Sequence, residues 1–453
     1  MSKSIENNLS EGNVFKKLIL FALPYLASNV IQSLYNVADM LIVGNFSGTV
    51  AMSGVNIGGQ VTFILTNMVV GLCMGATVLI GQYVGANNRN ALKQVTATII
   101  TLLLGVGAAV TVLMVILKNP VLRLIRTPEE SFGESSDYLL VTVLGTVFIF
   151  GYNALSSILR GMGNSRQPFY FVTAACVTNI VLDLVFVAVF RMGAFGAALA
   201  TVISQAMSMF LCIFYMVRNS FQFDFRPSSF KIDGGQLRLI IKVGFPTCVQ
   251  NSVTGLSFLF LTTIINIIGG VNASAAVGAV GKFNSFAFMP TMAMSVSIGA
   301  MAAHNMGAGK LPRAVEALKI GTVFSVIVTY LFFVLVQVFP AGILRLFGSD
   351  PAMIQAGVSY VRSFSFDFLL IPFLFCFNGF LIGGGHTMFT LVNSIFASLL
   401  LRMPACYILG VLLGYGLPGA GFGAPIATIG GLIAVFVYFR TGRWKENAVL
   451  GKG

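Results

Sequence analysis

Charged residues are scarce in this sequence. Asp, Glu, Lys and Arg together make up 9% of its 453 residues, whereas soluble globular proteins contain about 25%. Hydrophobic residues reach 57%, and the mean hydropathy is +0.90. These values exclude a large soluble core and indicate a polytopic membrane protein. The polar residues 1–13 lack the charged start, short apolar core and cleavage site of a signal peptide, so we expect the first apolar segment to remain in the mature protein.

Recognisable catalytic patterns are also missing. The chain has two histidines and shows no nucleophile–base spacing, metal-binding motif or phosphate-binding loop. We therefore expect no enzymatic activity, no ATP hydrolysis on this chain and no cofactor. The six cysteines occur singly in or beside apolar runs, without the spacing of a disulfide framework or metal site: Cys73, Cys176, Cys212, Cys248, Cys376 and Cys406.

The net charge of +13 does not indicate nucleic-acid binding, because the basic residues lie at the ends of apolar segments. If the N-terminus faces the cytoplasm, only five Lys or Arg residues lie between segments on the opposite side: Lys118, Arg123, Arg126, Arg191 and Arg345. Nineteen, including Lys3 and Lys452, lie on the cytoplasmic side. This bias predicts a multi-pass protein of the cell membrane with both termini in the cytoplasm.

Twelve apolar segments are long enough to cross a bilayer, which takes roughly 20 residues. They are residues 17–44, 52–80, 95–117, 138–159, 169–190, 195–217, 241–268, 275–303, 317–339, 353–381, 389–413 and 421–440. The sequence between residues 117 and 138 is expected to be an outer loop that carries several acidic residues: Glu129, Glu130, Glu134 and Asp137. The fold class is therefore all-α, with twelve transmembrane helices.

The two halves of the chain repeat each other. At an offset of 222, Pro24 matches Pro246 and Gly48 matches Gly270. Six is an even number of spans, so the two six-helix lobes run parallel and are related by a pseudo-two-fold axis along the membrane normal, a common transporter design. We expect a cytoplasmic tail (1–14), an N-lobe (15–217), a cytoplasmic linker (218–240), a C-lobe (241–440) and a second cytoplasmic tail (441–453).

Only three acidic residues lie inside the apolar segments: Asp39, Asp183 and Asp367. A charge inside the membrane costs about 2.5–3.5 kcal/mol on insertion scales and is a functional hypothesis by default. Asn179 precedes Asp183 by one helical turn, and at about 1.5 Å per residue the two first-lobe aspartates and Thr201 lie at one depth. Carboxylate, amide and hydroxyl oxygens suit a small cation or protons, so these four residues are predicted to bind Na⁺ or H⁺.

Further polar residues in the spans are expected to line a substrate cavity. In the first lobe they are Gln32, Tyr35, Asn36, Asn153 and Gln205, and in the second lobe Gln250, Asn251 and Asp367. The alternative for the asparagines and serines is that they only join helices through hydrogen bonds. Asp367 could equally form a structural pair with Arg362 or Arg402.

The chain resembles the multidrug and toxic compound extrusion (MATE) transporters over nearly its whole length. The motifs that carry the resemblance include Tyr35-Asn-Val-Ala-Asp39, Gly81-Gln-Tyr-Val-Gly85-Ala and Leu159-Arg-Gly-Met-Gly163-Asn. The resemblance implies a V-shaped antiporter that exports organic cations in exchange for Na⁺ or H⁺. It also implies that Asp39, with Asn179, Asp183 and Thr201, forms the first-lobe cation site. The span beginning near Pro246 has Gln250 and Asn251 but no acid, unlike some members, which favours coupling through the first lobe.

We therefore expect alternating access, in which ion binding bends the first span at Pro24, a weak point of the backbone, and displaces a small organic cation. We expect a monomer in the lipid bilayer. The alternative within transport is a flippase for lipid-linked oligosaccharides or other lipids, although the few basic residues in the spans argue against an anionic headgroup. A membrane enzyme or a receptor is a further alternative, but no catalytic constellation supports an enzyme, and a receptor does not explain the parallel repeat.

Overall fold

The computed structural model describes residues 6–219, 221, 223 and 225–450. Within them the chain forms helices and no strands, as predicted. Lys3 and Lys452, which contribute to the predicted charge bias, lie outside the described residues. By internal contacts the chain divides into two compact units. The first contains residues 6–8 and Leu23–Cys248, and the second contains Leu9–Ala22 and residues 249–450.

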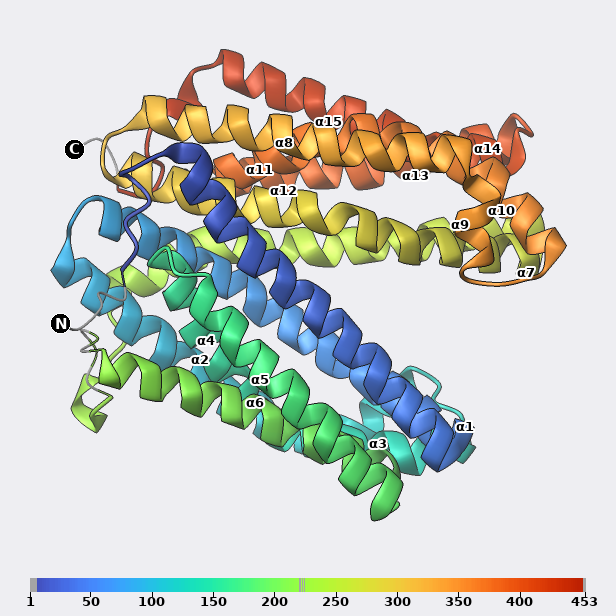
Figure 1. The fold of residues 1–453 in the computed structure, drawn as a ribbon, viewed down its shortest axis with the longest axis horizontal. Helices are drawn as coiled ribbons and strands as arrows, with labels where there is room; N and C mark the ends of the chain where they lie inside the picture. Colours follow the sequence, from blue (N-terminus) through green and yellow to red (C-terminus); the bar gives the residue numbers. More distant parts are fainter. Residues whose placement is uncertain (1–5, 220, 222, 224, 451–453) are drawn as a thin grey trace. The chain divides into compact units, whose positions relative to one another are not determined.

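The first unit is built from the helices of the first half of the chain, and α4, α5 and α6 run side by side in it (Figure 1). Its π-helical segment η1 directly continues α5. The elements are α1 (Val14–Gly85, mostly in this unit), α2 (Arg89–Leu124), α3 (Glu129–Leu144), α4 (Thr146–Gly161), α5 (Arg166–Asp183), η1 (Leu184–Val189), α6 (Gly193–Arg218) and the 3₁₀ turn η2 (Pro227–Ser229).

The second unit repeats this organisation with shorter helical pieces. It takes up most of α7 (Gly234–Gly307), followed by α8 (Leu311–Val338), α9 (Pro340–Arg345), α10 (Pro351–Phe364), η3 (Ser365–Leu369), α11 (Ile371–Gly383), α12 (Thr387–Ile395), η4 (Phe396–Arg402), α13 (Met403–Tyr407), η5 (Ile408–Leu412), α14 (Gly416–Gly421), α15 (Gly423–Arg440) and η6 (Arg443–Lys445).

Helices α1 and α7 each contain two of the predicted spans. Each is broken at one glycine with a backbone conformation that L side chains rarely adopt: Gly48 has φ 81° and Gly270 has φ 61°. In the described part of the chain, eight helices are long and apolar enough to span a membrane, and two bent pairs each add one more. Counting α1 and α7 twice gives the twelve predicted spans, and the paired glycines confirm the offset of 222.

The predicted span 138–159 is instead a bent pair. Helix α3 begins at Glu129, and a 50° bend separates it from α4. The acidic residues assigned to an outer loop are therefore helical, which corrects the prediction. The physical reason is that Pro128 precedes the helix and Glu129 and Glu130 lie in its first turn, where negative charge is stabilised by the helix dipole.

The start of α1 packs in the second unit. Leu9, Leu18 and Phe21 are buried in one hydrophobic cluster with Met294 and Ile298 of α7. Conversely, α7 as far as Cys248 belongs to the first unit. Each unit therefore holds the leading segment of the other unit's first helix, and the change occurs near Pro24 in α1 and near Pro246 in α7.

Candidate functional site

Three polar side chains follow one face of α1 in the first unit. Gln32, Tyr35 and Asp39 are spaced by three and four residues, which places them one above another on the helix. The Asp39 side chain is only 7% exposed. Pro24 lies within α1 without interrupting it, and its carbonyl accepts a hydrogen bond from the Ser28 hydroxyl at 2.8 Å.

Helices α5 and α6 supply the facing groups. Asn179 and Asp183 lie one turn apart at the end of α5 and are buried, and the Asn179 amide donates to the Thr201 hydroxyl at 3.5 Å. Small residues at the start of α6 allow this close packing: Ala194, Ala197 and Ala198 are fully buried. The π-helical segment η1 begins directly after Asp183, and π-helical turns are frequent at functional sites.

The structure brings all four predicted ion-binding residues together. The carboxyl groups of Asp39 and Asp183 are close enough to interact with each other. The Tyr138 phenol of α3 interacts with the Thr201 hydroxyl and lies within electrostatic reach of both carboxyl groups. Asp39, Tyr138, Asn179, Asp183 and Thr201 are called the first-unit cluster below.

Several oxygens of the first-unit cluster have no hydrogen-bond partner among the described residues. These are Oδ1 of Asp39, Oδ1 of Asn179 and both carboxyl oxygens of Asp183. No described Lys or Arg forms a salt bridge with either aspartate. Buried polar groups are normally paired, and an unpaired one is costly. The cluster therefore has the chemistry of a cation or proton site, because either ligand would satisfy these oxygens.

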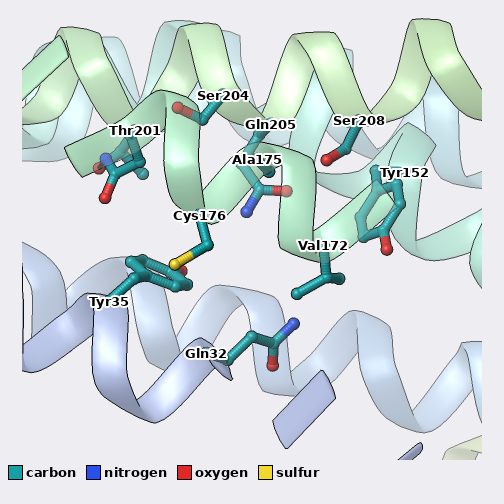
Figure 2. Close-up of a pocket in the computed structure, with 11 residues that line it drawn as sticks. Gln32, Tyr35, Tyr152, Val172, Ala175, Cys176, Thr201, Ser204, Gln205 and Ser208 are labelled. Atoms are coloured by element: carbon teal, nitrogen blue, oxygen red, sulfur yellow. Dashed lines mark hydrogen bonds between the residues drawn. The ribbon is translucent and has the colours of Figure 1, made fainter. Parts of the chain in front are cut away.

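A polar pocket extends from this cluster through the first unit. It is lined by Gln32, Tyr35, Tyr152, Val172, Ala175, Cys176, Asn179, Thr201, Ser204, Gln205 and Ser208. Figure 2 shows the amide groups of Gln32 and Gln205 reaching into this space from α1 and α6, with Thr201 at one end and Tyr152 and Ser208 at the other.

The remaining predicted cavity residues of the first lobe lie outside this pocket. Asn36 is exposed, and the Asn153 amide donates to the Ile149 carbonyl of its own helix at 2.8 Å. Neither residue is among those that line the pocket. Of the predicted cavity residues of the first lobe, Gln32, Tyr35 and Gln205 therefore line the same pocket as Asn179 and Thr201.

The predicted residues of the second lobe are arranged differently. The Gln250 amide oxygen accepts from Thr390 at 3.4 Å, and Asn251 is exposed. Asp367 is buried in η3, at the break between α10 and α11, and accepts a hydrogen bond from the Thr428 hydroxyl at 2.6 Å. The Arg402 charge is close enough to attract this carboxylate, without direct salt-bridge contact.

Tyr138 was not predicted from the sequence. Its ring packs against Gly58, where an added Cβ would lie 2.7 Å from a ring carbon. A tyrosine in an apolar helix is usually a packing residue and attracts no attention by itself. The repeat holds the signal that would have identified it, because at the offset of 222 Tyr138 matches another buried tyrosine, Tyr360.

A multi-carboxylate metal centre is not seen. The described residues contain no group of three or more His, Cys, Asp or Glu placed to hold a metal ion. The first-unit cluster has two carboxylates, and a transported sodium ion would complete its ligands with the Asn179 and Thr201 oxygens. Such oxygen ligands are the kind that hard cations prefer.

Comparison with known proteins gives a consistent result. The MatE family model matches residues 24–185 and 246–408, one match in each half of the chain. The chain is 28% identical to the probable multidrug resistance protein YpnP of Bacillus subtilis, over 97% of both proteins. It is 27% identical to the probable multidrug resistance protein NorM of Thermotoga maritima, over 96% of this chain and 94% of that protein. An FAD transporter of Shewanella oneidensis is 23% identical over 77% of this chain and 78% of its own length.

Solved structures show the same fold. An outward-facing multidrug resistance MATE family transporter superposes with a TM-score of 0.90 at 21% identity, covering 98% of this chain and all of the other. A MATE protein crystallised in the bent conformation superposes with a TM-score of 0.89 at 22% identity, covering 96% of both chains.

Proposed function

Because this chain belongs to the MatE family, we propose that it is a secondary active efflux transporter, which exports organic, mostly cationic and amphipathic compounds in exchange for Na⁺ or H⁺. The observation that carries the proposal is the set of buried, unpartnered oxygens on Asp39, Asn179 and Asp183. The family relationship and the names of the relatives YpnP and NorM support multidrug export.

The proposed mechanism is alternating access. An ion that enters from outside binds the first-unit cluster, neutralises one negative charge of the carboxyl pair and lowers the affinity for the exported compound. By linkage, the compound lowers the affinity for the ion by the same factor. Pro24 is the proposed hinge of α1, because its ring leaves one helical hydrogen bond unmade and it lies two residues beyond the change of unit at Ala22.

The proposal places the protein in the cell membrane as a monomer with both termini in the cytoplasm. The orientation of the termini rests on the predicted excess of Lys and Arg on one side. In the first unit, residue Asn7 bonds the Met162 carbonyl at 3.0 Å, so the N-terminal segment lies at the end where α4 stops and α5 starts. Arg160 and Arg166 lie at that same end.

Cationic substrates are favoured over anionic ones by the charges in the spans. Two carboxyl groups face each other in the first unit, and no described basic residue pairs with them. The FAD transporter among the relatives shows that anionic cargo occurs in similar proteins, and a lipid flippase would need basic residues for an anionic headgroup. The substrate test must therefore include an anionic dinucleotide and a fluorescent lipid.

Reconstitution into liposomes tests the proposal directly. Uptake or efflux of an organic cation is measured under an inward Na⁺ gradient alone, under a proton gradient alone and with neither. We expect transport against a substrate gradient in one of the first two conditions and none in the third. Equal rates in all three conditions would disprove ion coupling. Movement of the dinucleotide or the lipid instead of the cation would assign a different substrate class.

A further inference from the structure

One exposed face of α7 beyond Gly270 lacks large apolar side chains. Its residues recur at helical spacing and are small or polar: Asn272, Ala275, Gly278, Lys282 and Ser285. No large hydrophobic residue between positions 272 and 285 is exposed. The opposite face packs in the core of the second unit, where Ala279 and Val280 are buried.

Helix α8 of the same unit shows the composition of a face suited to lipid. Its exposed residues also recur about once per turn, but they are large and apolar: Val323, Ile327, Leu331, Leu335 and Val338. Hydrocarbon offers no hydrogen-bond partners, so polar groups exposed to it are costly. The face of α7 that carries Asn272, Lys282 and Ser285 is therefore suited to water rather than to lipid.

The repeat supports an aqueous surface at this position. At the offset of 222, Lys282 matches Gln60 and Gly278 matches Asn56. Both amide side chains are exposed in the first unit, and Gln60 donates a hydrogen bond to Asn56 at 2.7 Å. The same stretch of the repeat is thus polar and exposed in both units, and only the second unit places a charge there.

Lys282 lies inside the membrane-spanning part of α7. It is seven residues from the start of the predicted span 275–303, which is about 10 Å at 1.5 Å per residue. Its four-carbon stem is roughly 6 Å long, too short to bring the ammonium to the outer boundary. Charged residues at such a depth almost always face the bundle interior or a water-filled cavity, and they mark substrate or ion pathways.

The described protein leaves the Lys282 ammonium without an ion pair. No described acidic residue forms a salt bridge with it. Asp367 is the one acidic residue in the predicted spans of the second lobe, and its carboxylate already accepts a hydrogen bond from Thr428. The surface beside Lys282 is open, because a Cβ added at Gly278 or Gly281 would meet no atom within 4 Å. A positive charge and free space therefore lie next to each other.

We propose that Lys282 binds a carboxylate of the exported compound, so that the preferred substrates carry an anionic group in addition to their cationic one. This inference rests on the proposed export function and narrows its substrate class. The ammonium has three hydrogen-bond donors, and its attraction to a carboxylate is stronger near a low-dielectric membrane interior than in bulk water. A lipid phosphate is not the proposed ligand, because headgroups lie outside the hydrocarbon core, beyond the reach of this side chain.

A matched pair of dyes tests the proposal. One is a rhodamine with a free carboxylate, and the other is the methyl ester of the same rhodamine, which keeps the cationic ring system but has no anionic group. Equilibrium binding of both dyes to the purified full-length protein would be measured by fluorescence anisotropy in phosphatidylcholine nanodiscs. Lys282→Gln, which introduces the residue that the first unit has at this position, should weaken binding of the acid about fivefold, the upper end for an exposed ion pair.

Three comparisons isolate the carboxylate contact. Lys282→Gln should leave binding of the ester within about twofold of the wild type, and Lys282→Arg should retain the affinity for the acid, since both changes preserve the interaction that matters for that dye. Lys319→Gln is the matched control, because Lys319 is an exposed lysine of α8 in the same unit and lies outside the face described above. It should bind both dyes as the wild type does.

The outcomes that overturn the proposal are distinct. Unchanged binding of the acid in Lys282→Gln would remove Lys282 from the substrate site. Equal weakening of acid and ester would show a general loss of binding rather than recognition of a carboxylate. A loss that occurs only in nanodiscs containing phosphatidylglycerol would assign Lys282 to lipid headgroups. If the wild type shows no ion-driven transport but Lys282→Gln still loses the acid selectively, the proposed coupling fails and the role of Lys282 stands.

Discussion

The buried acidic groups of the two units differ in whether the protein itself satisfies them. In the first unit, both oxygens of Asp183 and one oxygen of Asp39 have no partner among the described residues. In the second unit, Asp367 receives a hydrogen bond from Thr428 and lies within reach of the Arg402 charge. The first arrangement leaves carboxyl oxygens without a partner in the described protein, and the second pairs its carboxylate internally.

The repeat shows how the two arrangements are related. Thr428 matches Thr201 after a five-residue shift, and Tyr360 matches Tyr138 at the offset of 222. The two family matches begin at residues 24 and 246, the same offset of 222, and at this offset Leu401 matches Asn179 and Ala405 matches Asp183. The second unit thus keeps the hydroxyl groups of the cluster but carries apolar side chains in place of the amide and the carboxyl.

The second unit thus has a positive charge, that of Arg402, within reach of its buried carboxylate, whereas no described Lys or Arg forms a salt bridge with the aspartates of the first unit. An internal cation cannot be exchanged during a transport cycle. We therefore propose that the exchangeable ion binds in the first unit and that Asp367 has a packing role in the second.

The largest expected effect separates the two kinds of aspartate. Asp39→Asn and Asp183→Asn should each lower ion-driven efflux in liposomes by at least about tenfold, equivalent to about 1.4 kcal/mol, because each removes a charge that the ion neutralises. Asp367→Asn should retain at least about half of the wild-type rate, since its carboxylate is already paired within the protein. An equally severe loss in Asp367→Asn would contradict the division of roles.

The next effect concerns stability. Thr428→Val removes the hydrogen bond to the buried Asp367 carboxylate and should lower the free energy of unfolding by about 1.5–3 kcal/mol, as for other hydrogen bonds to charged groups. Thr201→Val should change stability less, because its bond to Asn179 is long, at 3.5 Å. Thermal unfolding in detergent compares the two variants. A larger loss in Thr201→Val would reverse the comparison.

Tyrosine hydroxyls give a smaller effect. Tyr138→Phe should weaken binding of the coupling ion by about three- to tenfold, because the loss of one hydrogen bond costs about 0.5–1.5 kcal/mol and its hydroxyl interacts with Thr201. Tyr360→Phe should leave ion affinity unchanged. Ion-dependent tryptophan fluorescence or calorimetry would measure the affinity in purified protein. Equal affinities of the two variants would remove Tyr138 from the site.

The smallest effect compares the starts of α12 and α5. His386 bonds Tyr438 and the Glu446 carbonyl, each at 3.0 Å, whereas its counterpart at the offset of 222 is Asn164, which does not titrate. Burial lowers the pKa of His386 below its usual value of 6.5. On acidification through that value the unfolded chain binds a proton that the folded chain does not, so the folded state loses stability.

When the pH is lowered from 7.5 to 5.5, the melting temperature of His386→Asn should therefore fall less than that of the wild type. The difference should be below about 1 kcal/mol, because a pKa change of one unit corresponds to 1.36 kcal/mol. Parallel melting curves of the wild type and the variant at each pH provide the measurement. Identical pH dependence in the two proteins would show that His386 does not titrate in this range.

Much of the fold could be predicted because span length and hydropathy are local properties. The twelve spans, the paired breaks at Gly48 and Gly270, and the meeting of Asp39 with Asp183 follow from segment length, repeat offset and depth. The early start of α3 did not follow, because Glu129 and Glu130 look like loop residues until their helix-stabilising position after Pro128 is recognised.

Other features have no local signature. Tyr138 reaches the cluster only because Gly58 leaves room for its ring, and this is a property of two packed helices. The π-helical turn after Asp183 also depends on tertiary packing. Hydropathy gives the ends of each span but not the unit in which each turn of a long helix packs, so the assignment of Leu9–Ala22 to the second unit could not be read from the sequence.

That assignment has a consequence for how the polypeptide can be divided. A cut anywhere in residues 218–240 would separate each unit from a segment of its core. The N-terminal fragment would keep Leu9–Ala22 of the second unit, and the C-terminal fragment would keep residues of the first unit up to Cys248. Leu18 and Phe21, buried beside Met294 in the intact protein, would be left without their apolar neighbours in an isolated N-terminal half. Each half of the sequence thus supplies a segment to the other unit, and we expect that neither half folds by itself.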